Sequence, residues 1–361
     1  MQNIAIFCKT LLKGGAEKQA LILLKLLSED NKNVILINWS RDKVDPEHLT
    51  YIDNNSLKYF ALKGNWLTKY FHFLKIVRAE KISIVLSYLT LVNFIAGTSK
   101  LFLKDVTVVG GIRNERLPYY KFLFERWVHN NLNNASVFNN FSAKQKFEDR
   151  GFNPDKIFVI HNAIESNQLF TRTGERLSDI RIVTISRFVE QKDFRTALNS
   201  IKKLIERNNN KAISYYLVGY GPLEQEIRSM AENLNIMNRI KIFINPANIP
   251  DILNECDIYL STSLFEGLSN SIMEAMVAGL PVIATDVGDN KYLVKDGFNG
   301  YLVPCRDKNM IVTKLEYLME SREARNEFGY NSRSIIEKEF SKEKLLQNYL
   351  ELFSKVQPSL S

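Results

Sequence analysis

The stretch that decides the fold covers residues 258–285, with the sequence IYLSTSLFEGLSNSIMEAMVAGLPVIAT. The apolar residues at 258–260 predict a strand, which turns through a loop rich in glycine and hydroxyl groups into a helix over 270–278. Gly279 and Pro281 end that helix, and a second strand follows at 282–284. A strand, turn and helix in this order direct backbone N–H groups beyond the end of the sheet, which suits an anionic ligand.

Two carboxylates, Glu266 and Glu274, bracket seven residues of this stretch. Acidic side chains beside an anion site need a separate purpose, because they repel the anion. The simplest purpose is to accept hydrogen bonds from hydroxyl groups, as on a ribose or a sugar ring.

The rest of the chain alternates between short apolar runs and longer amphipathic segments. We expect strands at 4–8, 34–38, 82–86, 106–109, 135–138, 157–160, 180–185, 214–218, 240–244, 258–260, 282–284 and 301–303. Helices are expected between them at 16–28, 66–80, 92–103, 119–131, 142–150, 194–207, 223–233, 249–255 and 270–278. Only helical patterns remain after residue 305, at 308–321, 322–340 and 342–353. This rhythm predicts an α/β protein with two doubly wound domains, joined within the polar segment 162–178. Ligands of such sheets bind beyond the C-terminal strand ends, so we expect the active site in the cleft between the domains.

Composition narrows the class of protein. The chain has 361 residues, no apolar run long enough for a membrane helix, and no apolar stretch typical of a secretory signal at its N-terminus. Its three cysteines are scattered, without metal-ligand spacing, which favours a reducing, cytoplasmic compartment.

The net charge of +8 lies entirely in the first half: residues 1–165 carry 23 Lys and Arg against 15 Asp and Glu, and the remainder carries 25 of each. Such asymmetry suggests an acidic partner, although it can also serve solubility alone. The segments 63–78 and 119–127 are both basic and aromatic. Either can seat the first domain on anionic lipid, and the alternative is that the aromatic rings are core and the lysines are solvated.

Several loops that follow predicted strands carry candidate ligand groups. Arg187 and Lys192 follow the first strand of the second half, and together they can neutralise a diphosphate; the alternative is ordinary surface charge. Gly15 follows the first strand of the chain and leaves helix N–H groups accessible, as any βα turn can. Gly219 begins another glycine turn, and Asn245 with Pro246 follows the strand at 240–244, where backbone groups can edge a base; both segments can also be purely structural.

Taken together, these features resemble the nucleotide-sugar glycosyltransferases called family 4, of the glycosyl transferases group 1 type, which have the two-domain GT-B fold. The resemblance is strong from Arg187 to Val303, through Arg187 with Lys192, the glycine turn at 219–222, the Glu266-x7-Glu274 motif and residues 274–303. It is looser before that, at residues 14–17 and 160–164. The family implies an acceptor-binding domain over 1–165, with a C-terminal helix (342–361) crossing back to it, and a donor-binding domain over 176–341.

The resemblance also implies roles for single residues. Arg187 and Lys192 would hold the donor diphosphate and stabilise the leaving nucleoside diphosphate, without a metal ion or other cofactor. Glu274 would accept hydrogen bonds from the ribose, and Glu266 from the transferred sugar. The family usually retains anomeric configuration.

Backbone groups complete the implied donor site. The N–H groups of Gly267, Leu268 and Ser269 would approach the sugar and phosphates, and Gly15 would lie against the diphosphate from the first domain. Gly219, with the Asn245 segment, would border the nucleotide.

One position departs from the family pattern. Many relatives carry a histidine at the end of a first-half strand, where this chain has Arg113 and Asn114. That puts a histidine-dependent step in doubt. It makes Arg113 and Asn114 candidate acceptor-binding residues, with Arg113 able to bind an acceptor phosphate.

We therefore predict a hexosyltransferase that moves a sugar from a UDP- or GDP-sugar to a lipid-diphosphate-linked or oligosaccharide acceptor, in capsule, O-antigen or other surface-polysaccharide synthesis. It would be cytoplasmic and peripheral on the inner face of the plasma membrane. Another GT-B enzyme, such as an epimerase or a phosphorylase, is an alternative; an epimerase would turn over a nucleotide sugar without an acceptor. A nucleic-acid-binding protein is the alternative suggested by the pI of about 9.1, and the zero net charge of the second half argues against it.

Overall fold

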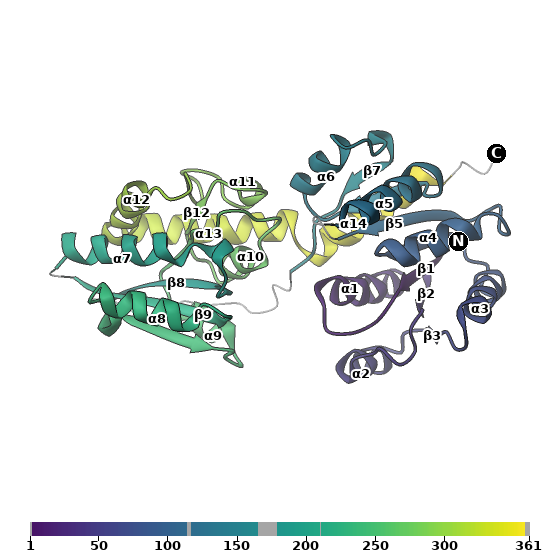
Figure 1. Ribbon diagram of the computed structural model, residues 1–361, viewed down its shortest axis with the longest axis horizontal. Helices are drawn as coiled ribbons and strands as arrows, with labels where there is room; N and C mark the ends of the chain where they lie inside the picture. Colours follow the sequence, from purple (N-terminus) through teal and green to yellow (C-terminus); the bar gives the residue numbers. More distant parts are fainter. Residues whose placement is uncertain (1, 114–116, 165–178, 210, 358–361) are drawn as a thin grey trace. The chain divides into compact units, whose positions relative to one another are not determined.

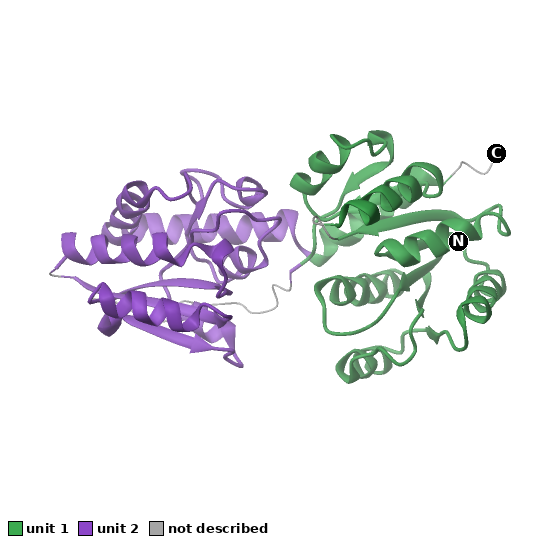
Figure 2. Cartoon of the chain, in the orientation of Figure 1, with its two compact units in different colours: residues 1–163, 342–361 green, residues 164–341 purple. Residues whose placement is uncertain are grey.

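The computed structural model describes residues 2–113, 117–164, 179–209 and 211–357. The chain divides into two compact units: unit 1 is residues 1–163 with 342–361, and unit 2 is residues 164–341 (Figure 2). Counted over these units, unit 1 has 26 Lys and Arg against 16 Asp and Glu, and unit 2 has 22 against 24. The net charges are therefore +10 and −2, a sharper contrast than the two halves of the sequence give.

Unit 1 is built on a parallel sheet whose strands lie in the order β3-β2-β1-β4-β5-β6-β7 (Figure 1). The strands are β1 Asn3–Cys8, β2 Asn33–Asn38, β3 Tyr59–Ala61, β4 Ile84–Tyr88, β5 Thr107–Ile112, β6 Ala135–Phe138 and β7 Ile157–Val159. The helices are α1 Gly15–Glu29, α2 Pro46–Asn54, α3 Trp66–Ala79, α4 Thr90–Ser99, α5 Tyr119–Asn131, α6 Phe141–Glu148 and α14 Lys342–Val356.

Alternate residues of the unit 1 strands separate its helices into two layers. Ile4 and Ile6 share one core with the buried residues of α1 and α14, whereas Ala5 and Phe7 share another with those of α3 and α4. Successive strand side chains point to opposite faces of a sheet, so these two helix sets cover opposite faces. The buried Phe122 of α5 packs with the end of β5 on the same face as α3 and α4.

Unit 2 repeats the doubly wound plan on a smaller sheet. Its parallel strands lie in the order β10-β9-β8-β11-β12-β13. They are β8 Asp179–Arg187, β9 Ala212–Tyr220, β10 Ile240–Ile244, β11 Ile258–Ser261, β12 Val282–Thr285 and β13 Gly300–Val303. The helices are α7 Phe194–Arg207, α8 Glu224–Asn233, α9 Ile249–Asn254, α10 Asn270–Val277, α11 Asn290–Leu293, α12 Lys308–Glu320 and α13 Arg322–Glu339.

The predicted architecture of two doubly wound α/β domains is confirmed, and three short elements were missed. α2 presents little apolar periodicity because Ile52 is its one fully buried side chain. Its start is nonetheless marked by Asp45, whose carboxylate accepts from the Glu47 N–H, and by Pro46 at the first helical position. β3 is a three-residue edge strand and α11 a four-residue helix, too short for either period to show.

The C-terminal helix α14 belongs to unit 1. Its buried residues Leu345, Tyr349 and Phe353 join the core that α1 covers. No helix in the part of the chain that the structure describes has both the length and the apolar character to cross a bilayer.

Candidate active site

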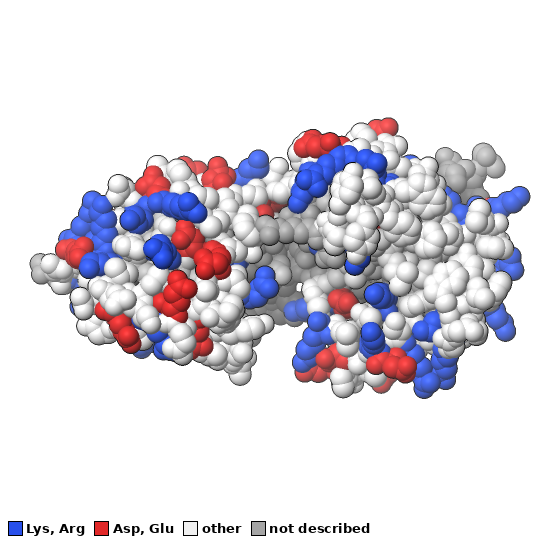
Figure 3. All heavy atoms as spheres, in the orientation of Figure 1, with Lys and Arg blue, Asp and Glu red and all other residues white. Residues whose placement is uncertain are grey.

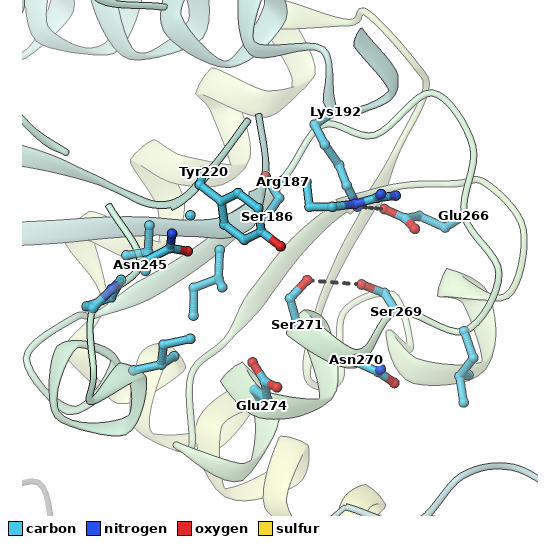
Figure 4. A pocket seen from close by; sticks show the side chains of 16 residues that line it. Ser186, Arg187, Lys192, Tyr220, Asn245, Glu266, Ser269, Asn270, Ser271 and Glu274 are labelled. Atoms are coloured by element: carbon cyan, nitrogen blue, oxygen red, sulfur yellow. Dashed lines mark hydrogen bonds and ion pairs between the residues drawn. The ribbon is translucent and has the colours of Figure 1, made fainter. Parts of the chain in front are cut away.

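A pocket of about 550 Å³ lies in unit 2 at the C-terminal ends of β8, β9 and β10 and at the start of α10 (Figure 4). The parallel register brings these ends together, because Gly219 of β9 pairs with Ser186 of β8 on one side and with Ile244 of β10 on the other. The lining residues are Ile185, Ser186, Arg187, Lys192, Val218, Gly219, Tyr220, Asn245, Pro246, Ile249, Glu266, Leu268, Ser269, Asn270, Ser271 and Glu274. The sequence prediction placed most of these polar residues at strand ends, and the fold gathers them around one cavity.

The centre of the charged side of the pocket is an ion pair between Lys192 and Glu266. Both side chains are largely shielded, with 13% and 10% of their surfaces exposed. The same Glu266 oxygen accepts a hydrogen bond of 2.7 Å from the Ser263 hydroxyl, and Gln191 Nε2 donates to the other oxygen at 3.4 Å. Three side chains therefore hold Glu266 in place. Glu266 in turn holds the Lys192 ammonium beside the pocket.

The backbone of two loops fixes this pair in place. Thr262 Oγ1 donates to the Lys192 carbonyl at 2.8 Å, and Leu264 N donates to the Gln191 carbonyl at 2.8 Å. Asp193 then caps α7 from a left-handed conformation, with φ 47° and ψ 56°. The loop after β8 and the loop after β11 are thus joined by hydrogen bonds to main-chain carbonyl groups, although they lie some seventy residues apart in sequence.

Gly288 is a positioning residue that sequence reasoning did not single out. It has φ +54°, and a Cβ added there would lie 1.9 Å from the Glu266 carbonyl oxygen. Any other residue would displace the backbone of Glu266. In the sequence, Gly288 is visible only as part of a turn after β12. Its contact with the Glu266 backbone can be seen only in the folded structure.

Arg187 ends β8 and is exposed at the pocket wall. Beside it, the Ser186 hydroxyl oxygen is buried and has no hydrogen-bond partner within the described part of the chain. A guanidinium and a buried hydroxyl facing one cavity provide donors for an anionic or hydroxylated ligand.

Gly219 lines the pocket, and its lack of a side chain allows β9 to pack closely against β8. Its φ is +150°, and a Cβ there would lie 1.8 Å from the Ser186 carbonyl oxygen. Gly221 has φ +154° and the same relation to Phe188, whose carbonyl oxygen would be 2.4 Å from a Cβ. Both glycines let the end of β9 pass close to the end of β8, which keeps Arg187 at the pocket.

The N-terminus of α10 forms the opposite side of the pocket. Ser269 caps the helix, with its hydroxyl 3.4 Å from Ile272 N and 3.2 Å from the Ser271 hydroxyl. Glu274 lies one turn further along and is well separated from Lys192 and Glu266 in Figure 4. The two glutamates therefore occupy different regions of one cavity, as two sets of hydroxyl groups in a single ligand would require.

The predicted base-edging segment also reaches the pocket. Asn245 adopts φ +45° directly after β10, and Pro246 follows it in the lining. The Tyr220 ring is 54% exposed at the same cavity. Leu268 and Ser269 line the pocket, whereas Gly267 is not among its lining residues.

The unit 1 candidates have a different environment. Gly15 is the first residue of α1, and a Cβ added there would meet no atom within 4 Å. Arg113 is engaged within unit 1: its guanidinium donates to Asn162 Oδ1 and to the Tyr349 hydroxyl at 3.2 Å each, and lies 5.2 Å from the centre of the Tyr88 ring. Asn114 lies outside the described residues.

Comparison with known proteins matches residues 166–335 to the family described as glycosyl transferases group 1. Unit 2 is a glycosyl transferases group 1 domain. The matched segment holds every residue of the pocket, including Arg187, Lys192, Glu266 and Glu274.

Two curated relatives illustrate the range of similar proteins. The poly(ribitol-phosphate) alpha-N-acetylglucosaminyltransferase of Staphylococcus aureus is 26% identical over 264 residues, which are 64% of this chain and 53% of that protein. The UDP-Gal:alpha-D-GlcNAc-diphosphoundecaprenol alpha-1,3-galactosyltransferase of Escherichia coli is 26% identical over 173 residues, 45% of each protein. The chain spans about half the length of the curated relatives it matches.

Solved structures extend the similarity to both units. HepE of Anabaena, determined in complex with UDP, has a TM-score of 0.81 at 16% identity and covers 98% of this chain and 100% of its own. This likeness establishes the fold, and the predicted GT-B fold class is confirmed.

Proposed function

We propose that this protein is a retaining glycosyltransferase. It would transfer a sugar from a UDP- or GDP-sugar to a glycan acceptor, carried on a lipid diphosphate, during synthesis of a bacterial surface polysaccharide. The observation that carries the proposal is the unit 2 pocket, which places Arg187, Lys192 and the start of α10 around one cavity with Glu266 and Glu274. The family match over the same residues supports it.

The cationic groups would act on the leaving group. During transfer the bond between the anomeric carbon and the diphosphate oxygen breaks, and a bond to the acceptor oxygen forms on the same face. The proton of the acceptor hydroxyl passes to the departing diphosphate. Arg187 and Lys192 would stabilise the negative charge that develops there, without a metal ion. Because Lys192 is held by Glu266, its ammonium is already in position before the charge develops.

The glutamates would recognise the donor on either side of the diphosphate. Glu274 would accept hydrogen bonds from the ribose, and Glu266 from the transferred sugar. The ion pair adds to the role predicted for Glu266, because its carboxylate both orients Lys192 and retains acceptor capacity for a hydroxyl group.

The acceptor side belongs to unit 1 in this proposal. The two curated relatives named above act on a poly(ribitol-phosphate) and on a diphosphoundecaprenol-linked sugar, so both acceptors carry phosphate. The +10 charge of unit 1 favours an acceptor of the same chemistry. We propose a peripheral position on the cytoplasmic face of the membrane for the same reason.

A thermal-shift screen of UDP, GDP and their sugars tests the donor, since a ligand that binds only the folded protein raises the midpoint. Hydrolysis of the stabilising nucleotide sugar, with and without acceptor, then tests the reaction. We expect one nucleoside diphosphate to raise the midpoint of the wild type and to have a much smaller effect on Arg187→Ala. An interconverted sugar with no transfer would instead identify an epimerase, and salt-sensitive oligonucleotide binding without any nucleotide effect would reject the proposal.

A further inference from the structure

The outward face of α3 is unusual for a surface helix. Leu67, Phe71, Lys75 and Arg78 follow one another at spacings of four, four and three residues, so they form one stripe. All four side chains are exposed, and those of Leu67 and Phe71 are 61% and 60% exposed. The solvent face of a helix in a globular domain normally carries polar residues. The exposed Leu67 and Phe71 therefore depart from the usual pattern.

The turn after α4 extends this stripe. Leu101 and Phe102 are 78% and 52% exposed. The centre of the Tyr70 ring lies 6.2 Å from the centres of the Phe71 and Phe102 rings. Arg78 also donates to the Phe102 carbonyl at 3.1 Å. A shallow hollow of about 470 Å³ lies between the two elements, lined by apolar side chains with the cations Lys75 and Arg78.

Helix α5 continues the surface on the same face of the sheet. Tyr120, Phe124 and Trp127 are exposed at spacings of four and three residues. The Phe94 ring of α4 contacts the rings of Phe124 and Trp127 at 5.2 and 6.5 Å, which places α5 beside α4. We call the exposed residues of α3, of the turn after α4 and of α5 the aromatic–basic face.

Charge is concentrated in the same segment. Residues 62–131 contain 11 Lys and Arg against 4 Asp and Glu, a net +7. Of those acids, Glu80 is paired with Lys58, and Glu125 is buried in a site where desolvation raises its pKa. Figure 3 shows blue side chains along the edge of unit 1 where Figure 1 places α3, and a broad white surface over α4 and α5.

We propose that the aromatic–basic face docks unit 1 on an anionic lipid bilayer. Exposed aromatic and leucine side chains would enter the boundary between headgroups and acyl chains, while the surrounding lysines and arginines would contact anionic headgroups. Charge complementarity selects this partner, and the exposed leucines separate it from nucleic acid, whose bases stack on aromatic rings. The docking rests on the proposed function for its purpose, which is to hold unit 1 beside a lipid-linked acceptor.

Co-sedimentation of the full chain with vesicles tests the docking without donor or acceptor. The vesicles are phosphatidylcholine alone and phosphatidylcholine mixed with phosphatidylglycerol. We expect wild-type binding to the anionic vesicles that weakens as salt is raised, and little binding to phosphatidylcholine alone. The double variant Leu67→Gln with Phe71→Gln should bind about tenfold more weakly or worse, because two inserted side chains are lost. Lys104 is exposed in the turn after α4. Lys75→Glu with Lys104→Glu should lose the preference for anionic lipid to a similar extent.

A matched control uses exposed residues of unit 2. Tyr330 is 75% exposed on α13, and Tyr330→Gln with Lys338→Glu removes one aromatic ring and reverses one charge there. This variant should bind vesicles like the wild type, and all variants should keep the wild-type circular dichroism spectrum and unfolding midpoint.

Three results would overturn the docking proposal: equal binding by wild type and Leu67→Gln with Phe71→Gln, no wild-type binding to either vesicle, or a concentration-dependent dimer that the same variant abolishes. Single-stranded oligonucleotide binding lost in that variant, without vesicle binding, would assign the face to nucleic acid. None of these results changes the donor assay, so the docking and the proposed function fail separately.

Discussion

Units 1 and 2 share a doubly wound plan, and they differ in what their helices present outward. In unit 2, α7 exposes the charged residues Arg195, Glu206 and Arg207. In unit 1, the solvent-facing side of α3 instead exposes Leu67 and Phe71. The net charges of −2 and +10 follow the same division.

The comparison shows that one fold can place its exposed charged and apolar groups in two different ways. Unit 2 concentrates it in a pocket at the ends of its strands, where the parallel register brings distant loops together. Unit 1 has exposed aromatic rings on the outer side of α3 and α5, where a flat partner can reach them. A small polar ligand suits the first arrangement, and an extended surface suits the second.

The strongest way to break this comparison is to remove the chemistry of the unit 2 pocket. Arg187→Ala should lower turnover of the nucleotide sugar about a thousandfold, close to 4 kcal/mol, because charge on the leaving group loses a cationic partner. Steady-state kinetics of transfer measures the loss. Arg195→Ala, which removes an exposed arginine of α7, serves as the control and should leave turnover unchanged. Turnover of Arg187→Ala within about threefold of the wild type would sink the donor assignment.

The glycines of the two units provide the next contrast. Gly219→Ala should lower the free energy of unfolding of unit 2 by about 4 kcal/mol, because its Cβ would lie 1.8 Å from a backbone oxygen and its φ of +150° disfavours a side chain. In unit 1, the Cβ of Gly15→Ala would have no atom within 4 Å. This substitution should change the free energy of unfolding of unit 1 by less than about 1 kcal/mol.

The positions of the tryptophans allow each unit to be followed. Trp39, Trp66 and Trp127 all lie in unit 1, so their fluorescence reports its unfolding, while circular dichroism reports both units. Gly219→Ala should shift the urea transition seen by circular dichroism more than the one seen by fluorescence. Equal stability of Gly219→Ala and the wild type would contradict the packing described at the ends of β8 and β9.

Unit 1 should also be the more acid-sensitive unit, through His129. Its Nε2 donates to the Asn153 carbonyl at 3.0 Å, so its Nδ1 accepts from the Ser136 hydroxyl at 2.8 Å. Burial lowers the pKa of His129 from 6.5 to about 4. The neutral ring is therefore favoured in the folded state, and its stabilisation is complete above pH 6.5 and is lost as pH falls toward 4.

The loss for this single group is about 3 kcal/mol, which is the pKa difference expressed as free energy. Urea unfolding monitored by tryptophan fluorescence should show the stability advantage of the wild type over His129→Gln shrinking by that amount between pH 7 and pH 4. His72→Gln, at an exposed position on α3, should leave the pH profile unchanged. A constant difference across this range would show that His129 does not carry the acid sensitivity.

The smallest effect sharpens the comparison within the pocket. Glu274→Gln should weaken binding of the stabilising nucleoside diphosphate about tenfold, since a charge-assisted acceptor for ribose hydroxyls becomes a neutral one. Isothermal titration calorimetry measures the change, with Glu226→Gln on the exposed face of α8 as the control. Unchanged affinity in Glu274→Gln would show that Glu274 does not bind the ribose hydroxyl groups.

Much of this molecule was predictable from its sequence, because strand periodicity and glycine turns are local signals. The predicted strand at 240–244 and the predicted helices at 119–131 and 194–207 coincide with β10, α5 and α7, because the period of apolar residues is also a local signal. The Lys192–Glu266 pair was not predictable, since the residues belong to loops after different strands and meet only through the parallel sheet. For Gly219 the sequence left a structural turn and a donor-binding position as alternatives, and only the fold reveals the close approach of Ser186 of the neighbouring strand.

The membership of α14 in unit 1 has a consequence for synthesis of the protein. A ribosome completes residues 1–163 and then the whole of unit 2 before it makes α14. Until then the apolar side of α1 that packs on Tyr349 and Phe353 is uncovered. Unit 1 is thus begun before unit 2 and completed after it, so the apolar side of α1 stays open to non-native contacts while unit 2 is made.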